Sequence, residues 1–329
     1  MKAVQIGRFG GPEVLDVVEV PTPTPAAGQI LVRLRSIGVN LADTLTRMDR
    51  YAVTPPLPAI LGAEAAGVVE AVAADISGFS VGQRVAVPLF ASNSLGAYAE
   101  FAVIDAGLAV PLPDAISFDQ AAALMIQGLT ALYLTRQAPP KGKVVLINAA
   151  AGGVGSLLVQ LAKQAGARTV IAGASSAQKL EFVRSLGADA GVNYATPDWT
   201  EELRRVTAGN GPDIVYESVG HEVTTASLAA LAPLGQIVIY GALNIQNFQL
   251  GVPELLSLIF KNQSLTGFAL APLLSPEGLR AGLGELFDLV TRGELVVTIG
   301  GRYPLAEASE AHRALEGRGT TGKLILTCG

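Results

Sequence analysis

The chain has 329 residues, of which 50% are apolar and 16% are charged. Since domains usually comprise roughly 100–200 residues, this length predicts two domains. The net charge is −5, and no basic stripe alternates with aromatic residues, which argues against a nucleic-acid partner. The single cysteine, Cys328, excludes an internal disulfide and a cysteine-rich zinc site.

The high apolar content raises the question of a membrane-spanning segment. The longest candidate, residues 223–243, is interrupted by polar residues, proline and glycine, whereas a spanning helix needs ~20 largely uninterrupted apolar residues. The excess apolarity instead suits a buried parallel sheet and an oligomer interface. Met1 leads directly into a short strand-like run with no targeting signal, so we expect a cytoplasmic protein with no membrane partner.

The chain up to about residue 115 is rich in short Val and Ile runs separated by Gly and Pro. Strands are expected at 30–34, 67–72 and 84–87. Many short strands with tight turns predict a compact, partly open barrel.

From about residue 140, apolar runs alternate with helical patterns. Strands are expected at 144–149, 169–173, 213–217 and 236–241, with helices at 154–165 and 177–186 among them. This alternation predicts an α/β fold with a doubly wound parallel sheet.

The C-terminal part becomes β-like again at 296–305, followed by an expected helix at 305–316 and a last strand at 323–327. This tail is expected to return to the first domain. We therefore expect a catalytic domain over 1–120, a dinucleotide-binding domain over 121–295 and a C-terminal return to the catalytic domain over 296–329.

The strongest local motif is V-V-L-I-N-A-A-A-G-G-V-G at 144–155, an apolar strand entering a glycine turn that opens into an amphipathic helix. A dinucleotide fingerprint requires this context. Gly152 and Gly153 allow close approach of a pyrophosphate, Gly155 permits tight helix–strand packing, and Ala150 replaces the first fingerprint glycine. The helix N-terminus offers free N–H groups to the phosphates. A turn that serves packing alone is the alternative.

The segment after the second strand of this domain indicates the cofactor. An acidic residue there would bind the ribose 2′-hydroxyl of NAD, but 171–179 reads I-A-G-A-S-S-A-Q-K. Ser175, Ser176 and Lys179 offer two hydroxyls and a cation that suit a 2′-phosphate. NADPH is favoured, with a merely solvated Lys179 as the alternative.

Several familiar catalytic sets are missing. Catalytic zinc needs three protein ligands, and besides carboxylates the chain offers only His221, His312 and Cys328. Both histidines are expected at surface or packing positions. No G-x-S-x-G nucleophile elbow occurs. Hydride transfer remains, because it requires little from the protein beyond positioning and a dry pocket.

Ordered motifs extend from one end of the chain to the other. They are M-K-A-V-Q-I-G-R-F-G-G-P-E-V-L at the start, G-V-N-L-A-D-T-L-T-R at 38–47, G-A-E-A-A-G-V-V at 62–69, V-G-Q-R-V-A at 81–86, G-A-Y-A-E-F at 96–101 and G-T-T-G-K-L-I-L at 319–326. Together with the glycine turn, they resemble the zinc-free, zeta-crystallin-like quinone oxidoreductases of the medium-chain dehydrogenase/reductase superfamily. The resemblance implies a Rossmann domain for NADPH and a GroES-like catalytic domain.

The resemblance also implies a metal-free site, because zinc-dependent members carry a cysteine ligand at the position of Asn40 and a histidine ligand at that of Ala63. It implies that Asn40, Tyr51 and Thr130 line the nicotinamide. The residues it implies for cofactor binding are Ala151, Gly152, Gly153, Val154, Ser175, Lys179, Tyr194, Gly241, Ala242, Leu243, Phe268, Leu270 and Arg318. Structural roles stay open for several of these, such as a Thr130 hydroxyl that only bonds back to its helix.

The expected activity is transfer of hydride from NADPH to a quinone, with Asn40 and Tyr51 hydrogen-bonded to the developing oxyanion. The proton is expected from Tyr51 or from water. Reduction of the C=C bond of an α,β-unsaturated ketone, acid or thioester is the alternative, and a non-catalytic NADPH-binding protein is the second one. A homodimer is expected through the apolar segment 263–270 and the preceding helix at 253–260.

Overall fold

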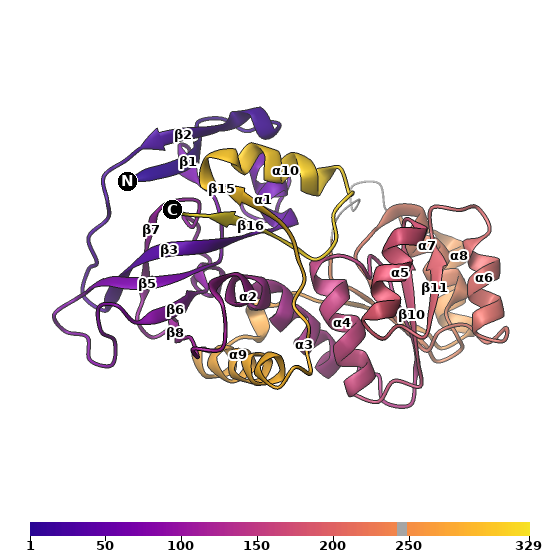
Figure 1. Ribbon diagram of the computed structural model, residues 1–329. Helices are drawn as coiled ribbons and strands as arrows, with labels where there is room; N and C mark the ends of the chain where they lie inside the picture. The colour runs from indigo at the N-terminus through magenta and orange to yellow at the C-terminus, as the bar shows by residue number, and fades with distance from the viewer. Residues whose placement is uncertain (242–248) are drawn as a thin grey trace. The chain divides into compact units, whose positions relative to one another are not determined.

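The computed structural model describes residues 1–241 and 249–329. The chain forms two compact units, Met1–Leu129 with Ala271–Gly329, and Thr130–Leu270. The first unit therefore combines the two ends of the sequence, indigo and yellow in Figure 1. These limits differ from the boundaries expected after residues 120 and 295, because two helices of that middle segment, described below, pack within the β-rich unit.

A seven-stranded sheet forms the centre of the first unit. Its order is β15 (Ile299–Pro304), β16 (Lys323–Thr327), β3 (Gln29–Val39), β5 (Ala65–Val72), β6 (Arg84–Val87) and β8 (Val110–Pro111), and β7 (Phe101–Asp105) also pairs with β3. A smaller sheet has the order β2 (Leu15–Glu19), β1 (Lys2–Ile6) and β4 (Ala59–Ile60). Strand β16 pairs antiparallel with β3, so the chain's last strand lies beside an early one.

The first unit also contains four α-helices. They are α1 (Leu41–Arg47), α2 (Phe118–Ala123), α9 (Pro276–Thr291) and α10 (Ala308–Glu316), and a π-helical turn over Leu124–Gly128 continues α2. Ser117 caps α2 by accepting a hydrogen bond from the Gln120 N–H at 3.2 Å. Helix α2 packs against β3 and β5, and α9 packs against the π-helical turn, which is why both belong to this unit.

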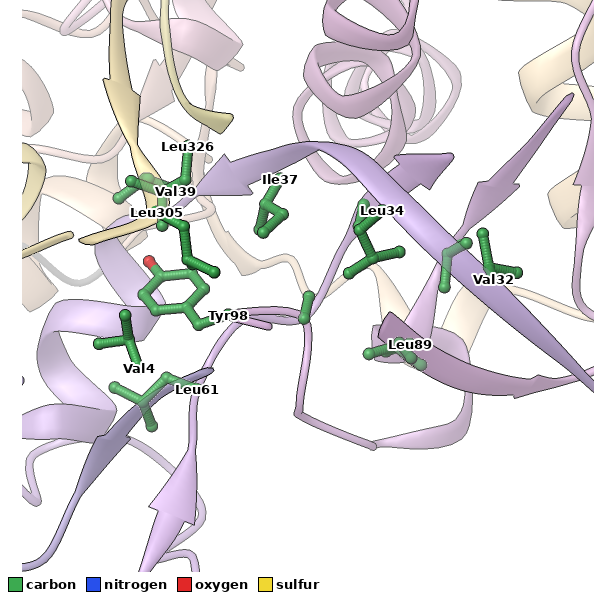
Figure 2. Close-up of a cluster of buried hydrophobic side chains, with 14 of the residues drawn as sticks. Val4, Val32, Leu34, Ile37, Val39, Leu61, Leu89, Tyr98, Leu305 and Leu326 are labelled. Atoms are coloured by element: carbon green, nitrogen blue, oxygen red, sulfur yellow. The ribbon is translucent and has the colours of Figure 1, made fainter. Parts of the chain in front are cut away.

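The core of the first unit is closed by residues far apart in the sequence. Figure 2 shows the ring of Tyr98 among Val4, Leu61, Leu305 and other side chains. All four of these residues are at least nine-tenths buried. Burial of each such aliphatic side chain is worth about 1.5–3 kcal/mol, so the two ends of the chain are joined by a shared apolar interior.

The second unit contains one parallel sheet of six strands. Its order is β11 (Ala190–Asn193), β10 (Thr169–Ala174), β9 (Val144–Ile147), β12 (Ile214–Glu217), β13 (Gln236–Ile239) and β14 (Ser264–Gly267). The helices are α3 (Leu129–Gln137), α4 (Gly153–Gln164), α5 (Ala177–Ser185), α6 (Trp199–Val206), α7 (His221–Ala230) and α8 (Val252–Phe260). When the strands are numbered by their order along the chain, they lie side by side as 3-2-1-4-5-6. This is the Rossmann order, so the predicted fold class is confirmed.

Candidate functional site

The glycine turn of the second unit lies at the point where the strand order reverses. Ligands of open α/β sheets bind outside the carboxyl ends of the strands at this point, here between β9 and β12. Helix α4 begins at Gly153, and Gly152 is its N-cap residue. Ala149 adopts a left-handed conformation with φ of +51°. The predicted residues Ala151, Gly152, Gly153 and Val154 thus form the turn and the first helical residues at the switch point.

Gly155 allows this turn to lie tightly against its own helix. A Cβ atom added to Gly155 would lie 2.6 Å from Cα and 2.8 Å from the carbonyl carbon of Ala150. Both atoms belong to the backbone, which cannot move aside as a flexible side chain can.

The substitution Gly155→Ala is therefore expected to displace α4 from the turn. We expect a loss of about 1–3 kcal/mol in unfolding free energy and a dinucleotide affinity weaker by about tenfold or more. Fluorescence of Trp199, which is buried in the same unit, reports the unfolding, and calorimetry reports the binding. Gly284→Ala in α9, where no atom lies within 4 Å of the added Cβ, is the control for the binding measurement, since it lies in the first unit.

A buried carboxylate supports the loop on the other side of the switch point. Glu217, at the end of β12, accepts hydrogen bonds from the Val219 N–H at 2.5 Å, the Gly220 N–H at 2.9 Å and the Asn148 side-chain amide. Burial raises the pKa of Glu217, although these donors oppose the shift. Asn148 follows β9 and also donates to Ser227 Oγ at 2.9 Å. The carboxylate and the amide therefore tie the ends of the two central strands together.

The predicted 2′-phosphate residues lie just after β10 and β11, which are neighbours, or in the first turn of α5. Ser175 and Ser176 follow β10, and Ser176 caps α5 by accepting from the Lys179 N–H at 3.3 Å. Tyr194 follows β11, and its N–H donates to the carbonyl oxygen of Ala174 at 3.0 Å. The structure thus brings Ser175, Lys179 and Tyr194 to one corner of the sheet.

The remaining predicted cofactor residues of this unit follow β13 and β14. Gly241 comes after β13, and Phe268 after β14 donates its N–H to the carbonyl oxygen of Ile239 at 2.9 Å. Leu270 is partly buried at the end of the unit. Ala242 and Leu243 lie outside the described residues.

Asn40, the predicted substrate-facing amide, lies in the first unit and is 5% exposed. Its Nδ2 donates to Glu64 Oε1 at 2.8 Å, and its Oδ1 accepts from Lys323 Nζ at 2.8 Å. Lys323 also contacts Glu64 Oε1 at 2.5 Å, and both of these side chains are almost completely buried. Sequence reasoning missed Glu64 and Lys323, although a charged residue next to an apolar strand was a signal for each.

A second buried polar network begins at the backbone of Asn40. The Asn40 N–H donates to Asp43 Oδ2 at 2.8 Å, and the Tyr98 hydroxyl lies 3.4 Å from the same oxygen. Tyr98 lies 2.9 Å from His312 Nε2, and Arg47 donates to His312 Nδ1 at 2.9 Å. Since arginine has no acceptor, we assign the ring proton of His312 to Nε2, which donates to Tyr98.

Burial determines how the titratable groups of this network behave. Burial raises the pKa of Asp43 from 3.8 to about 7, against the opposing effects of the Asn40 N–H and Lys323. Burial and the charge of Arg47 lower the pKa of His312 from 6.5 to about 3. His312, expected at a surface or packing position, is fully buried and neutral.

Three more residues complete the predicted set. Tyr51 is 50% exposed, and partial burial, with a smaller effect of Asp43, raises the pKa of its hydroxyl. Thr130 is buried at the second residue of α3 and belongs to the second unit. Arg318 is exposed in the first unit, two residues after the end of α10, with a φ of +54°. Each unit thus holds part of the predicted set.

No three side chains of His, Cys, Asp or Glu lie close enough to hold a metal ion in the two ranges that the structure covers. Within the same ranges, no helix combines the length and apolar character needed to span a bilayer.

Comparisons with known proteins identify the family. Residues 26–114 match the alcohol dehydrogenase GroES-like domain, and residues 153–291 match the zinc-binding dehydrogenase model. The chain is 38% identical to the quinone oxidoreductase of Pseudomonas aeruginosa over 330 residues, 99% of each protein. The chain belongs to the quinone oxidoreductase family. This family lies within the medium-chain dehydrogenase/reductase superfamily, so the predicted resemblance is confirmed.

Two further members of the superfamily bear on function. The crystal structure of Escherichia coli quinone oxidoreductase complexed with NADPH has a TM-score of 0.91 and 36% identity, with all of both chains covered. The 2-haloacrylate reductase of Burkholderia sp is 36% identical over 334 residues, 98% of each protein.

Proposed function

We propose that this protein is a cytoplasmic, zinc-independent enzyme that reduces a quinone at the expense of NADPH. The observation that carries the proposal is the likeness over the whole chain to quinone oxidoreductases, one of them solved with NADPH. The acceptor is a small molecule with a polarised carbonyl, because hydride transfer to such a group requires little from the protein beyond positioning.

The second unit fits NADPH in two respects. The backbone of Ala151–Val154 opens α4 at the switch point, where N–H groups and the helix dipole suit a pyrophosphate. Ser175 and Tyr194 directly follow β10 and β11, and Lys179 lies in the first turn of α5. Segment 171–179 contains no Asp or Glu to repel a 2′-phosphate. We assign Gly241, Phe268 and Leu270 to the nicotinamide half of the cofactor, together with Ala242, Leu243 and, from the first unit, Arg318.

NADPH, when bound, supplies the hydride. The protein's task is then to polarise the acceptor carbonyl and to stabilise the negative charge that develops on its oxygen. We assign this task to the second Nδ2 proton of Asn40, since the first one is donated to Glu64. A tyrosine hydroxyl is protonated at neutral pH, and the pKa of Tyr51 is raised further above its usual 10, so the hydroxyl can donate a second hydrogen bond. We assign Thr130 to the nicotinamide side of the site.

The absence of a zinc requirement has support in the first unit itself. The amide of Asn40 lies 2.8 Å from the ammonium of Lys323, at the position where zinc-dependent members of the superfamily carry a cysteine ligand. The oxygen of this amide accepts from Lys323 and its nitrogen donates to Glu64, so the amide is engaged by two side chains at the position where a metal ligand would be needed. Activity is therefore expected to survive prolonged dialysis against a chelator.

The cofactor assignment predicts that Lys179→Met selectively weakens NADPH binding. Loss of a cation beside the 2′-phosphate is expected to raise the Kd for NADPH by about tenfold or more, while the Kd for NADH changes little. Calorimetric titration with both dinucleotides measures the two effects. Lys179→Arg keeps the charge and is the matched control. Equal weakening of both dinucleotides by Lys179→Met would contradict the assignment.

Reduction of an activated C=C bond is a second candidate, favoured by the likeness to the 2-haloacrylate reductase. Both reactions need hydride delivery beside a polarised carbonyl. The decisive assay follows NADPH oxidation with a benzoquinone and with an enone as acceptors. Faster reduction of the quinone supports the first proposal, and reduction of the enone alone moves the substrate to the second. NADPH binding without turnover of either acceptor leaves a non-catalytic binding protein.

We also propose a homodimer that joins two second units. Strand β14 is at the end of the strand order, with β13 on its other side. Helix α8, which precedes β14, carries four apolar side chains that are 49–80% exposed: Val252, Leu255, Ile259 and Phe260. Exposed apolar side chains on the helix that leads into an edge strand of the described sheet suit an isologous interface.

The dimer is expected to dissociate in the variant Ile259→Glu/Phe260→Glu. Each protomer would then place two carboxylates in the apolar interface, where their desolvation costs several kcal/mol. Light scattering at micromolar concentration should give a dimer mass for the wild type and a monomer mass for the variant. Glu285→Gln in α9 is a surface control. A wild-type protein of monomer mass would disprove the interface.

A further inference from the structure

The amide of Asn40 is one corner of a closed, buried triangle. Its Nδ2 donates to Glu64, its Oδ1 accepts from Lys323, and Lys323 donates to Glu64. Asn40 is 5% exposed, Glu64 0% and Lys323 2%. The three residues are separated by as many as 283 positions in the chain, so the contacts arise from the fold alone.

Three neighbouring strands bring the triangle together at one end of the sheet. Asn40 directly follows β3, Glu64 directly precedes β5, and Lys323 begins β16. Strands β5 and β16 both run antiparallel to β3, with Ile37 opposite Ala65 and Val39 opposite Leu324. The end of β3 therefore faces the starts of both neighbours.

The carboxylate of Glu64 is itself held in place. Its second oxygen, Oε2, accepts from the Ile126 N–H at 2.7 Å, within the π-helical turn. Its side chain crosses Gly38, where an added Cβ would lie 2.8 Å from both Cδ and Cγ of Glu64. The carboxylate thus has little freedom to rotate, and a residue larger than glycine at position 38 would displace it.

This surrounding fixes which way the amide of Asn40 faces. An ammonium only donates hydrogen bonds and a carboxylate only accepts them. If the amide flipped, its NH₂ group would face Lys323 and its oxygen would face Glu64, and both contacts would become repulsive. One Nδ2 proton is used by Glu64, so the triangle also fixes the direction of the other.

We propose that Lys323 and Glu64 are positioning residues that aim the second Nδ2 proton of Asn40 at the oxygen of the acceptor carbonyl. The inference rests on the proposed function, in which Asn40 stabilises that oxygen. Donors fixed before the reaction need no reorganisation while charge develops, which is where they lower the barrier most. The balance of one ammonium against one carboxylate lets the amide be held this way in a buried site.

The test separates positioning from stability by removing both charges together. Lys323→Met alone leaves the buried carboxylate of Glu64 without its cation and is expected to destabilise the fold. Glu64→Gln/Lys323→Met removes both charges, so its melting temperature should recover toward that of the wild type. With NADPH and a benzoquinone, kcat of this double variant should stay about 10- to 100-fold low, while the KM for quinone and the Kd for NADPH change little.

Asn40→Ala provides the coupling test. If Lys323 and Glu64 act through Asn40, adding Asn40→Ala to the double variant lowers kcat little further. Arg292→Met/Glu294→Gln removes an exposed ion pair of the same unit and is the matched control, with kcat expected at the wild-type value. Wild-type kcat in the folded double variant, or a loss in the triple variant equal to the product of the separate losses, would overturn the inference.

A spectroscopic readout keeps this outcome distinct from failure of the proposed function. The two side-chain amide protons of Asn40, assigned by their loss in Asn40→Ala, should have well-separated NMR shifts in the wild type. The shifts should move in Glu64→Gln and stay in Arg292→Met/Glu294→Gln. Unmoved shifts in Glu64→Gln refute the positioning whether or not quinone is reduced. If the shifts move but the wild type reduces no quinone, the proposed function fails, whereas Glu64 and Lys323 still fix the orientation of the Asn40 amide.

Discussion

Replacing Arg47 with methionine is expected to lower the unfolding free energy of the first unit by about 3–5 kcal/mol. The Arg47 side chain is completely buried. It donates to Gly10 O at 3.0 Å, to His312 Nδ1 at 2.9 Å and to Glu316 Oε1 at 2.5 Å. Methionine fills similar space but donates nothing, so a carbonyl, an imidazole and a carboxylate lose their donor at once.

Amide hydrogen exchange of β16 measures this effect, because β16 is paired inside the first unit. The fluorescence of Trp199, the one tryptophan of the chain, reports the second unit and is expected to change little. Arg313→Met is the matched control in α10, since Arg313 is 47% exposed and pairs with Glu310; it should cost less than about 1 kcal/mol. Similar exchange rates in Arg47→Met and Arg313→Met would show that the buried network contributes little.

Several local elements of both units could be predicted from the sequence because they depend on near neighbours. The apolar run before the glycine turn is β9, and the helix expected from residue 154 is α4, which starts one residue earlier. Strand β16 has the limits expected for the last strand, 323–327. In each case the period of the apolar residues and the adjacent glycines carry the signal.

The polar interior of the first unit could not be predicted in this way. Arg47 and His312 are 265 positions apart, and Asn40 and Lys323 are 283 apart. No periodicity reports such a pairing, and a lone histidine in a terminal helix gives no sign that it is buried. Helix α1 was also missed, because its seven residues are too few to show an apolar stripe. Asn40 was predicted from the family resemblance, whereas its partners came only from the fold.

The second large effect concerns the pH dependence of stability. Between about pH 4 and 7, Asp43 is protonated in the folded protein and ionised in the unfolded chain, since burial raises its pKa from 3.8 to about 7. Unfolding then releases a proton, so this group makes stability fall as pH rises, by about 1.4 kcal/mol per pH unit. Between about pH 3 and 6.5, His312 is neutral when folded and charged when unfolded, so it makes stability rise with pH at a similar slope.

The two slopes oppose each other from about pH 4 to 6.5 and largely cancel in the wild type. Asp43→Asn should therefore gain a slope of about +1.4 kcal/mol per pH unit relative to the wild type over this window. His312→Gln should gain about −1.4 kcal/mol per pH unit there, and the double variant should match the wild type. Exchange of β16 amides at a series of pH values, corrected for intrinsic rates, measures the differences. Because Tyr98 links Asp43 to His312, any departure of the double variant from the sum of the two single variants measures how strongly the two titrations are coupled.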